Sequence, residues 1–311
     1  MDKSNIWQMS AIEIVKAIKS KSLSAVEVTE AAINRQERLD EKLHAFCTPS
    51  PDLARKMAAK VDAEIAAGRD PGPLAGVPVG IKDLVATKEI KTVCGSKAYE
   101  NHTPEEDDIV VERLREAGAI FLGKTNVPEF GYSGVGHNPV FETTRNPWNT
   151  DMTPGGSSAG SGSSVAAGLC PIAVGSDGGG SIRIPAAHCG LVGIKASMGR
   201  VPLYPGCRDE RFPGISSWES LEHIGPISRT VADSALMLSV MAGPDPRDRH
   251  TIPTTDVDWL NLSTDNLKGK KIGFSADFGY LAVDPEVREV VAKAAKVFDL
   301  KSYVSPTTLI R

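Results

Sequence analysis

The sequence lacks the features that mark membrane, secreted and nucleic-acid-binding proteins. No apolar run approaches the roughly 18 residues that a membrane-spanning helix needs, and the first residues, MDKSNIWQMS, contain no basic region followed by an apolar core. The formal net charge is -4 at pH 7, so there is no excess of Lys and Arg to neutralise a phosphate backbone. We therefore expect a globular, cytoplasmic protein with no direct nucleic-acid or membrane partner.

Cysteine chemistry is also poorly represented. The chain has 5 cysteines, an odd number, and no C-x-x-C pair that would indicate zinc or redox chemistry. We expect reduced and mostly buried thiols at Cys47, Cys94, Cys170, Cys189 and Cys207.

The N-terminal part of the chain has the pattern of a helical scaffold. Ser10 and Ser24 are each followed three residues later by Glu, which is the capping box that opens a helix. None of the expected helices contains residues that suggest chemistry. The expected bounds are residues 10–46 for two helices, Pro51–Ala67 for a third, 1–70 for the whole helical segment and 71–311 for the core on which it packs.

From Leu74 onward, short apolar runs alternate with helical patterns, which is typical of a sheet covered by helices. We predict a mixed α/β fold with helices on both faces of the sheet. Residues 152–164 are rich in Gly and Ser but run directly into an apolar helical stretch, so we interpret them as a shaped loop. The predicted strands are Val77–Ile81, Ala119–Leu122, Ile172–Val174 and Lys271–Phe274; the predicted helices are Asp107–Ala117, Val165–Leu169, Asp233–Ala242 and Pro285–Phe298, with a long loop over 243–266.

Gly118–Thr125, GAIFLGKT, matches the P-loop pattern G-x-x-x-x-G-K-[ST] letter for letter. A P-loop follows its strand, whereas Ala119–Leu122 is an apolar run that must itself be the strand. Pro128 also breaks any helix that would offer its N-terminus to phosphate. We therefore interpret this segment as a buried strand that ends in a polar turn.

Gly156–Gly160, GSSAG, matches the nucleophile elbow G-x-S-x-G of α/β hydrolases, with Ser158 as the attacking residue. That elbow needs a strand directly before it, but the preceding residues, NPWNTDMTPG, are rich in turn formers. None of the 6 histidines is an obvious base. A Ser-His-Asp/Glu triad around Ser158 stays open as an alternative.

Three longer motifs form a consistent set: LAGVPVGIKD ending at Asp83, PGGSSAGS ending at Ser161, and GSDGGGSIR ending at Arg183. Together they closely resemble the amidase signature family. The resemblance extends over roughly residues 5–298 through GKTN, NPW, PAAHCGLVGIK, GRVP and GPISRTVAD. It implies the mixed α/β fold of that family.

The resemblance also assigns roles to residues of the three motifs. It implies a triad of Lys82 as base, Ser157 as bridging serine and Ser181 as nucleophile. In the family the bridging serine follows a non-prolyl cis peptide bond, which here is the bond between Gly156 and Ser157. The remaining implied roles are an oxyanion hole made by the N–H groups of Gly178, Gly179 and Gly180, and loop support from Asp177, Arg183 and Ser158.

Such a triad needs a neutral lysine. A serine hydroxyl is a weak nucleophile at neutral pH and needs a neighbouring base. A free lysine has a pKa of about 10.4, so the site must favour the neutral amine by about 4 to 5 kcal/mol. The apolar neighbours Val79 and Ile81 would desolvate Lys82 and act in that direction. A serine suits the bridge because a hydroxyl both donates and accepts a hydrogen bond.

The implied reaction is hydrolysis of a carboxylic amide through an acyl-Ser181 intermediate, with no metal or organic cofactor. Loops over 130–141 and 204–218 are expected to form the substrate pocket. Their aromatic side chains favour an aryl or alkyl amide as the small-molecule partner; the candidates are Phe130, Tyr132, Tyr204, Phe212 and Trp218.

Two other functions remain open. One is a glutaminase-type component resembling the A subunit of glutamyl-tRNA amidotransferase, which hands ammonia to a partner. The other is a catalytically silent scaffold, because after Phe298 the chain no longer resembles the family, whose members usually continue with further strands. A core that is incomplete at this end leaves an unpaired sheet edge, so we also expect self-association into a homodimer.

Overall fold

The computed structural model describes residues 3–206, 218, 220–253, 257–261 and 272–298. They belong to two compact units, residues 1–260 and 261–311, and each is described here by itself. The two capping boxes are present: Ser10 caps α1 (Ala11–Lys19) and Ser24 caps α2 (Ala25–Leu43), each with the reciprocal glutamate bond. The predicted third helix is α3 (Pro51–Ala66).

The N-terminal segment is not purely helical, because it also supplies an edge strand of the sheet. β1 (Phe46–Pro49) follows α2 and pairs antiparallel with β3 (Ile120–Thr125). The segment is tied to later parts of the chain as well, since the Ile12 N–H donates to Asp233 and the Arg229 guanidinium donates to the Met9 carbonyl. Residues 1–70 therefore share one hydrophobic core with the residues that follow them.

The sheet is mixed and has six strands in the order β1-β3-β2-β4-β6-β5. β2 (Pro78–Lys82), β3 and β4 (Ile172–Ser176) correspond to three of the four predicted strands, and they run parallel to one another. β6 (Ile224–Ser228) pairs antiparallel with β4, and the two-residue β5 (Val192–Gly193) pairs antiparallel with β6. β2, β3, β4 and β6 are buried along their whole length, as expected for strands covered on both faces.

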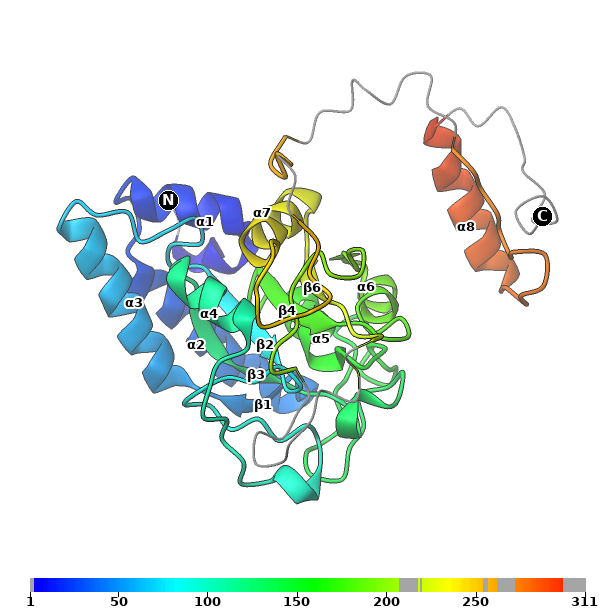
Figure 1. Cartoon of the computed structure of the whole chain (residues 1–311), viewed down its shortest axis with the longest axis horizontal. Coiled ribbons are helices and arrows are strands. Elements are labelled where there is room, and N and C mark those ends of the chain that lie inside the picture. Colours follow the sequence, from blue (N-terminus) through cyan, green and yellow to red (C-terminus); the bar gives the residue numbers. More distant parts are fainter. Residues whose placement is uncertain (1–2, 207–217, 219, 254–256, 262–271, 299–311) are drawn as a thin grey trace. The chain divides into compact units, whose positions relative to one another are not determined.

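Helices pack on the sheet, with α3 against β3, α5 (Ala159–Ala166) against β4, and α7 (Val231–Met241) against β6. Figure 1 shows α2 and α3 to one side of the strands and α5 and α6 (Arg183–Cys189) to the other. The predicted mixed α/β fold is therefore confirmed. The Gly/Ser segment does lead into a helix, but that helix begins at Ala159, earlier than predicted. α4 (Ile109–Glu116) and α7 agree with prediction, and short 3-10 helices cover Lys3–Gln8, Lys97–Tyr99 and Glu129–Gly131.

The second unit contains α8 (Pro285–Ala295), continued by a 3-10 helix over Lys296–Phe298, as predicted. The strand predicted at Lys271–Phe274 is wrong for its described residues: 272–274 have no strand conformation, because no described strand pairs with them.

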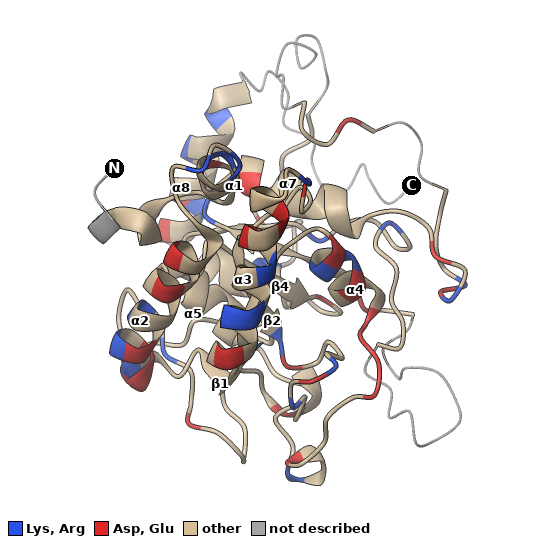
Figure 2. Cartoon of the chain, turned by 90° about the vertical axis from the view of Figure 1, so that its left-hand side faces the viewer, with Lys and Arg blue, Asp and Glu red and all other residues tan. Residues whose placement is uncertain are grey.

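Figure 2 shows charges of both signs on α2 and α3. In the part of the chain that the structure describes, no helix is long and apolar enough to cross a membrane.

Candidate active site

Two parallel strands bring the first site residues together. β2 and β4 are neighbours, so their carboxyl ends lie at the same edge of the sheet, where α/β proteins commonly bind ligands. Lys82 ends β2 and Ser176 ends β4. The Lys82 side chain is fully buried; its Nζ lies 2.7 Å from Ser157 Oγ, 2.9 Å from Ser176 Oγ and 3.0 Å from the Ser176 carbonyl oxygen. The predicted base and bridging serine are therefore in direct contact.

Ser157 lies in a closely packed loop. The peptide bond between Gly156 and Ser157 is cis, as the family resemblance implies. Gly131 closes over this loop with φ 71°, a backbone conformation that favours glycine. A Cβ atom at Gly131 would lie 2.7 Å from the end of the Leu84 side chain and 3.2 Å from Ser157 Oγ, so a larger residue here would press on both side chains.

Ser158 holds the two motif loops together. Its hydroxyl donates to the Ser176 carbonyl oxygen at 3.2 Å and accepts from the Ser176 N–H at 3.2 Å, while its own N–H donates to the Ser181 carbonyl oxygen at 3.2 Å. Ser158 is fully buried, and no strand directly precedes it. The nucleophile-elbow interpretation is therefore wrong, because the Ser158 hydroxyl is engaged in the protein interior.

The P-loop match is likewise part of the sheet, and the predicted buried strand is present; the polar turn predicted after Leu122 is wrong, because the strand continues to Thr125. Gly123, Lys124 and Thr125 lie within β3, and Lys124 is fully buried. Lys124 Nζ donates to the Val85 carbonyl oxygen and, at 2.9 Å, to the Thr87 hydroxyl. A lysine committed to these acceptors inside the fold is not placed to bind a nucleotide phosphate.

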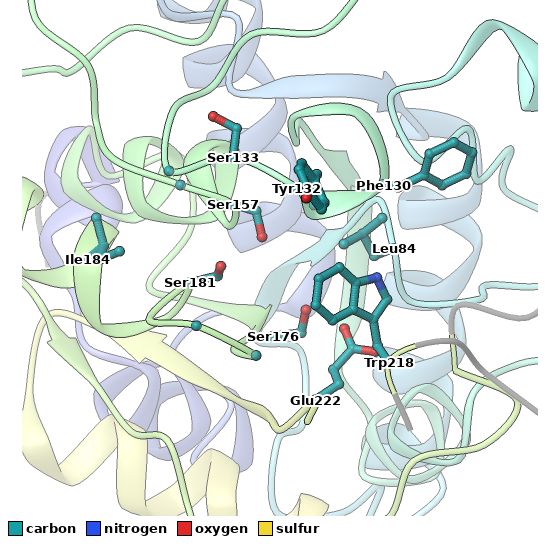
Figure 3. A pocket seen from close by; sticks show the side chains of 15 residues that line it. Leu84, Phe130, Tyr132, Ser133, Ser157, Ser176, Ser181, Ile184, Trp218 and Glu222 are labelled. Atoms are coloured by element: carbon teal, nitrogen blue, oxygen red, sulfur yellow. The ribbon is translucent and has the colours of Figure 1, made fainter. Parts of the chain in front are cut away.

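A pocket of about 230 Å³ opens beside Ser157, and Ser181 and Ser176 also line it. Figure 3 shows the Ser157 and Ser181 hydroxyls pointing toward one another across this pocket. No hydrogen bond joins these two hydroxyls in the described structure. The contact between Lys82 and Ser157 is thus formed, while the contact from Ser157 to Ser181 is not; catalytic hydrogen bonds are often long before substrate binds.

The glycine loop before Ser181 divides into two parts. Gly178 and Gly179 line the pocket. Gly180 does not; its φ is 117° and its N–H donates to the Asp177 carboxylate at 2.7 Å. The predicted oxyanion hole therefore has to be corrected: the Gly180 N–H is used inside the loop, which leaves the N–H groups of Gly178 and Gly179 as candidates.

Asp177 and Arg183 brace this loop. The Arg183 guanidinium donates two hydrogen bonds, at 2.9 and 3.1 Å, to the fully buried Asp177 carboxylate, which also accepts from the Gly180 and Ile182 N–H groups. Burial acts to raise the pKa of Asp177, but the Arg183 side chain and the two backbone donors outweigh it and lower that pKa to about 2. Asp177 is therefore ionised at neutral pH and holds the backbone that leads into Ser181.

The pocket walls are mainly apolar. Phe130, Tyr132 and Trp218 line the pocket, together with Leu84 and Ile184. Tyr204 does not line it, and its prediction as a pocket residue is wrong: its carbonyl oxygen accepts from the Ile109 N–H, which places it at the start of α4. Phe212 lies outside the described residues.

Sequence reasoning included Ser133 only as part of the expected pocket loop over 130–141, and it missed two other polar residues of the pocket, Ser176 and Glu222. Ser176 could have been found, because it is the second residue of the motif that ends at Arg183 and closely follows the strand predicted over 172–174. Glu222 had no such signal, since it follows the aromatic loop outside the three motifs. No group of three His, Cys, Asp or Glu that could hold a metal ion occurs among the described residues, and the four described cysteines are free.

Comparison with known proteins gives a consistent result. The model of the family described as Amidase matches residues 27–303. The chain is 46% identical over 294 residues to the A subunit of glutamyl-tRNA(Gln) amidotransferase from Carboxydothermus hydrogenoformans, an alignment that covers 94% of this chain and 59% of that protein. The chain thus spans about three fifths of the length of this curated relative.

Solved structures are also similar. A bacterial aryl acylamidase, described as belonging to the amidase signature enzymes, superposes with a TM-score of 0.86 at 36% identity, and the match covers 95% of this chain and 60% of that one. The peptide amidase from Stenotrophomonas maltophilia superposes with a TM-score of 0.82 at 33% identity, over 94% of this chain and 60% of that one.

Proposed function

This chain belongs to the amidase signature family of hydrolases, and from that premise we propose that it cleaves a carboxylic amide through an acyl-enzyme on Ser181. The observation that carries the proposal is the 2.7 Å contact between Lys82 Nζ and Ser157 Oγ, at a pocket that Ser181 also lines. Complete burial of Lys82 disfavours its charged form, which is the direction that a lysine base needs.

The reaction uses the three side chains in sequence. Ser181 Oγ attacks the amide carbon while its proton passes to Ser157 and the proton of Ser157 passes to Lys82. The N–H groups of Gly178 and Gly179 stabilise the negative charge that develops on the carbonyl oxygen. The C–N bond then breaks, the amine leaves with the proton returned through Ser157, and water hydrolyses the acyl ester to release the acid and restore Ser181.

The apolar pocket walls support an aryl or alkyl amide as substrate. The test is hydrolysis of a series of acyl-4-nitroanilides by the wild type, Ser181→Ala and Ser133→Ala. Ser133 is the matched control because it also lines the pocket, but Figure 3 shows its hydroxyl pointing away from Ser181. We expect hydrolysis by the wild type and Ser133→Ala and none by Ser181→Ala. Equal activity of the two variants would refute the role of Ser181.

A second candidate is a glutaminase-type component of a larger enzyme, which is supported by the 46% identity to the A subunit of glutamyl-tRNA(Gln) amidotransferase. It predicts release of ammonia from glutamine only when the partner proteins of such an amidotransferase are added. Hydrolysis of anilides by the isolated chain, with no response to those partners, would favour the free-standing amidase. Absence of both activities would favour a catalytically silent scaffold.

We also infer self-association of this chain. β5 is an edge strand of only two residues, and an exposed sheet edge offers unpaired N–H and C=O groups to another chain. A homodimer that pairs these edges would satisfy them. Light scattering should give twice the mass of the chain, and a strictly monomeric species would contradict this inference.

A further inference from the structure

One carboxyl group in the pocket has no role in the relay described above. Glu222 lies two residues before β6, is only 7% exposed and is the single carboxyl among the described residues that line the pocket. Burying a charge without a partner is costly. Figure 3 shows the Glu222 carboxyl group beside Ser176, so this serine is the contact that indicates its role.

Ser176 connects Glu222 to the base. Burial raises the pKa of Glu222, whereas a hydrogen bond with the Ser176 side chain and the positive charge of Lys82 act in the opposite direction. The same Ser176 hydroxyl lies 2.9 Å from Lys82 Nζ. Glu222 and Ser176 therefore form a second chain of polar groups that reaches Lys82, in addition to the contact from Ser157.

The contacts of Lys82 Nζ determine which groups must donate and which must accept hydrogen bonds in this second chain of polar groups. A neutral amine has two N–H donors and one lone pair, and to take a proton from Ser157 its lone pair has to face Ser157 Oγ. The Ser176 carbonyl oxygen can only accept, so it takes one N–H at 3.0 Å. The Ser176 hydroxyl must accept the other N–H, and its own hydrogen must then go to a different acceptor. The Glu222 carboxylate, which lies beside Ser176 in Figure 3 and is buried, is the acceptor that the pocket offers.

We propose that Glu222 is a positioning residue for the base: by accepting the hydrogen of the Ser176 hydroxyl, it holds that hydroxyl as an acceptor for Lys82 and keeps the lysine lone pair directed at Ser157. This inference rests on the proposed function, because it assigns Lys82 the role of base. Without the Glu222 acceptor, the Ser176 hydroxyl is free to donate to the lysine lone pair and so compete with Ser157.

Other titratable groups surround Glu222 and have to be separated from Lys82 in any test. His223 follows it in the chain, and Asp108, the N-cap of α4, interacts electrostatically with it. The His223 Nδ1 lies 2.8 Å from the Leu221 carbonyl oxygen. His223→Gln therefore serves as a control that removes the neighbouring imidazole and retains Glu222.

The experiment is the pH dependence of Ser181 labelling by a fluorophosphonate in the full chain, with kinact and KI determined separately. Glu222→Leu removes the acceptor and the charge, whereas Glu222→Gln keeps an acceptor oxygen and removes only the charge. We expect kinact to fall about 10- to 100-fold in Glu222→Leu and to stay near the wild-type value in Glu222→Gln, with KI unchanged in both.

The pH profile of kinact gives a second readout, in its acid limb, where kinact falls as the pH is lowered. A negative charge beside Lys82 favours its ammonium form, so removing that charge favours the neutral amine. The limb should therefore move to lower pH in both Glu222 variants. It should stay in place in His223→Gln and in Glu41→Gln, which removes an exposed carboxylate from the end of α2, a helix with no residue that lines the pocket.

The outcomes separate the inference from the function on which it rests. A change in KI with unchanged kinact would make Glu222 a ligand-binding group and overturn the inference. An unshifted acid limb in both variants, or a loss of folded protein with unchanged kinact, would overturn it too. Failure of the wild type to react at Ser181 would instead overturn the proposed function, and this inference with it.

Discussion

Two lysines on neighbouring strands are both completely buried, yet they have different surroundings. Lys82 ends β2 and Lys124 lies in β3. In the parallel register of these two strands, Lys82 lies opposite Thr125 and Lys124 lies opposite Ile81. Because side chains alternate across a sheet, this register puts the two lysines on opposite faces. Lys82 reaches the hydroxyls of Ser157 and Ser176 at the pocket, whereas Lys124 lies among acceptors in the protein interior.

Their electrostatic partners differ as well. Burial lowers the pKa of Lys124, and the nearby Asp83 carboxylate opposes that effect. Burial likewise raises the pKa of Asp83 to about 6, against the opposing charge of Lys124. Lys124 thus interacts electrostatically with a buried carboxylate, whereas Lys82 contacts two hydroxyls that line the pocket. Burial alone therefore does not distinguish the proposed base from a structural lysine; the groups that each nitrogen contacts do.

Substitution of Lys82 should have the largest effect on activity. Lys82→Met removes the proposed base but keeps the length and apolar volume of the side chain, so the rate of amide hydrolysis should fall about 1000-fold or more. The free energy of unfolding should change little by comparison, because an apolar side chain replaces a buried polar one. Steady-state kinetics and urea denaturation of the same sample measure the two quantities, and retained hydrolysis would contradict the assignment.

The reciprocal change, Lys124→Met, should act on the fold. It leaves the buried Asp83 without its opposite charge, which typically costs about 3 to 5 kcal/mol of unfolding free energy. The protein that remains folded should still react at Ser181. Urea denaturation checks the size of the effect, and adding Asp83→Asn as a second substitution should recover part of the loss; a fully stable single variant would be the opposite result.

The raised pKa of Asp83, beside Lys124, should make the stability of the protein depend on pH. Its pKa of about 6 in the folded protein lies above the value of about 3.9 in an unfolded chain, so the unfolded state releases the proton first. Stability from this group is fully present below pH 4 and is lost as the pH rises to 6. Wild-type Tm should therefore fall relative to Asp83→Asn over this range, and parallel profiles would argue against the raised pKa.

The smallest effect concerns one hydroxyl beside Lys124. Thr87→Val removes an acceptor that lies 2.9 Å from Lys124 Nζ, and the loss of one such hydrogen bond typically costs about 1 kcal/mol. Because Thr87 is not among the pocket-lining residues, the labelling rate of Ser181 should not change. A stability loss with a matching loss of labelling rate would show that the two lysine environments are coupled.

Much of the fold was predictable from local patterns. The capping boxes at Ser10 and Ser24 locate two helices, and apolar runs locate β2, β3 and β4. β1 and β5 escaped prediction because strands of four and two residues have no readable alternation. β6 was hidden by Gly225 and Pro226, which are unusual inside a strand.

Site residues were predictable where a sequence motif identifies them. They were not predictable where tertiary contacts determine the position of a residue or the direction of its N–H group. The resemblance indicated Lys82 and Ser157, and the structure brings their side chains into contact. It could not show that Gly180 turns its N–H toward Asp177, since that depends on one backbone dihedral. Nor could it show that Tyr204 packs at the start of α4, away from the pocket.

We propose that Lys82, and not Lys124, activates Ser181. Intact-mass measurement after exposure to a fluorophosphonate tests it most directly, with the wild type, Ser181→Ala, Lys82→Met and Lys124→Met treated side by side. We expect one adduct per chain in the wild type and in folded Lys124→Met, and none in Ser181→Ala or Lys82→Met. Labelling of Lys82→Met at the wild-type rate, or an adduct that persists in Ser181→Ala, would contradict it.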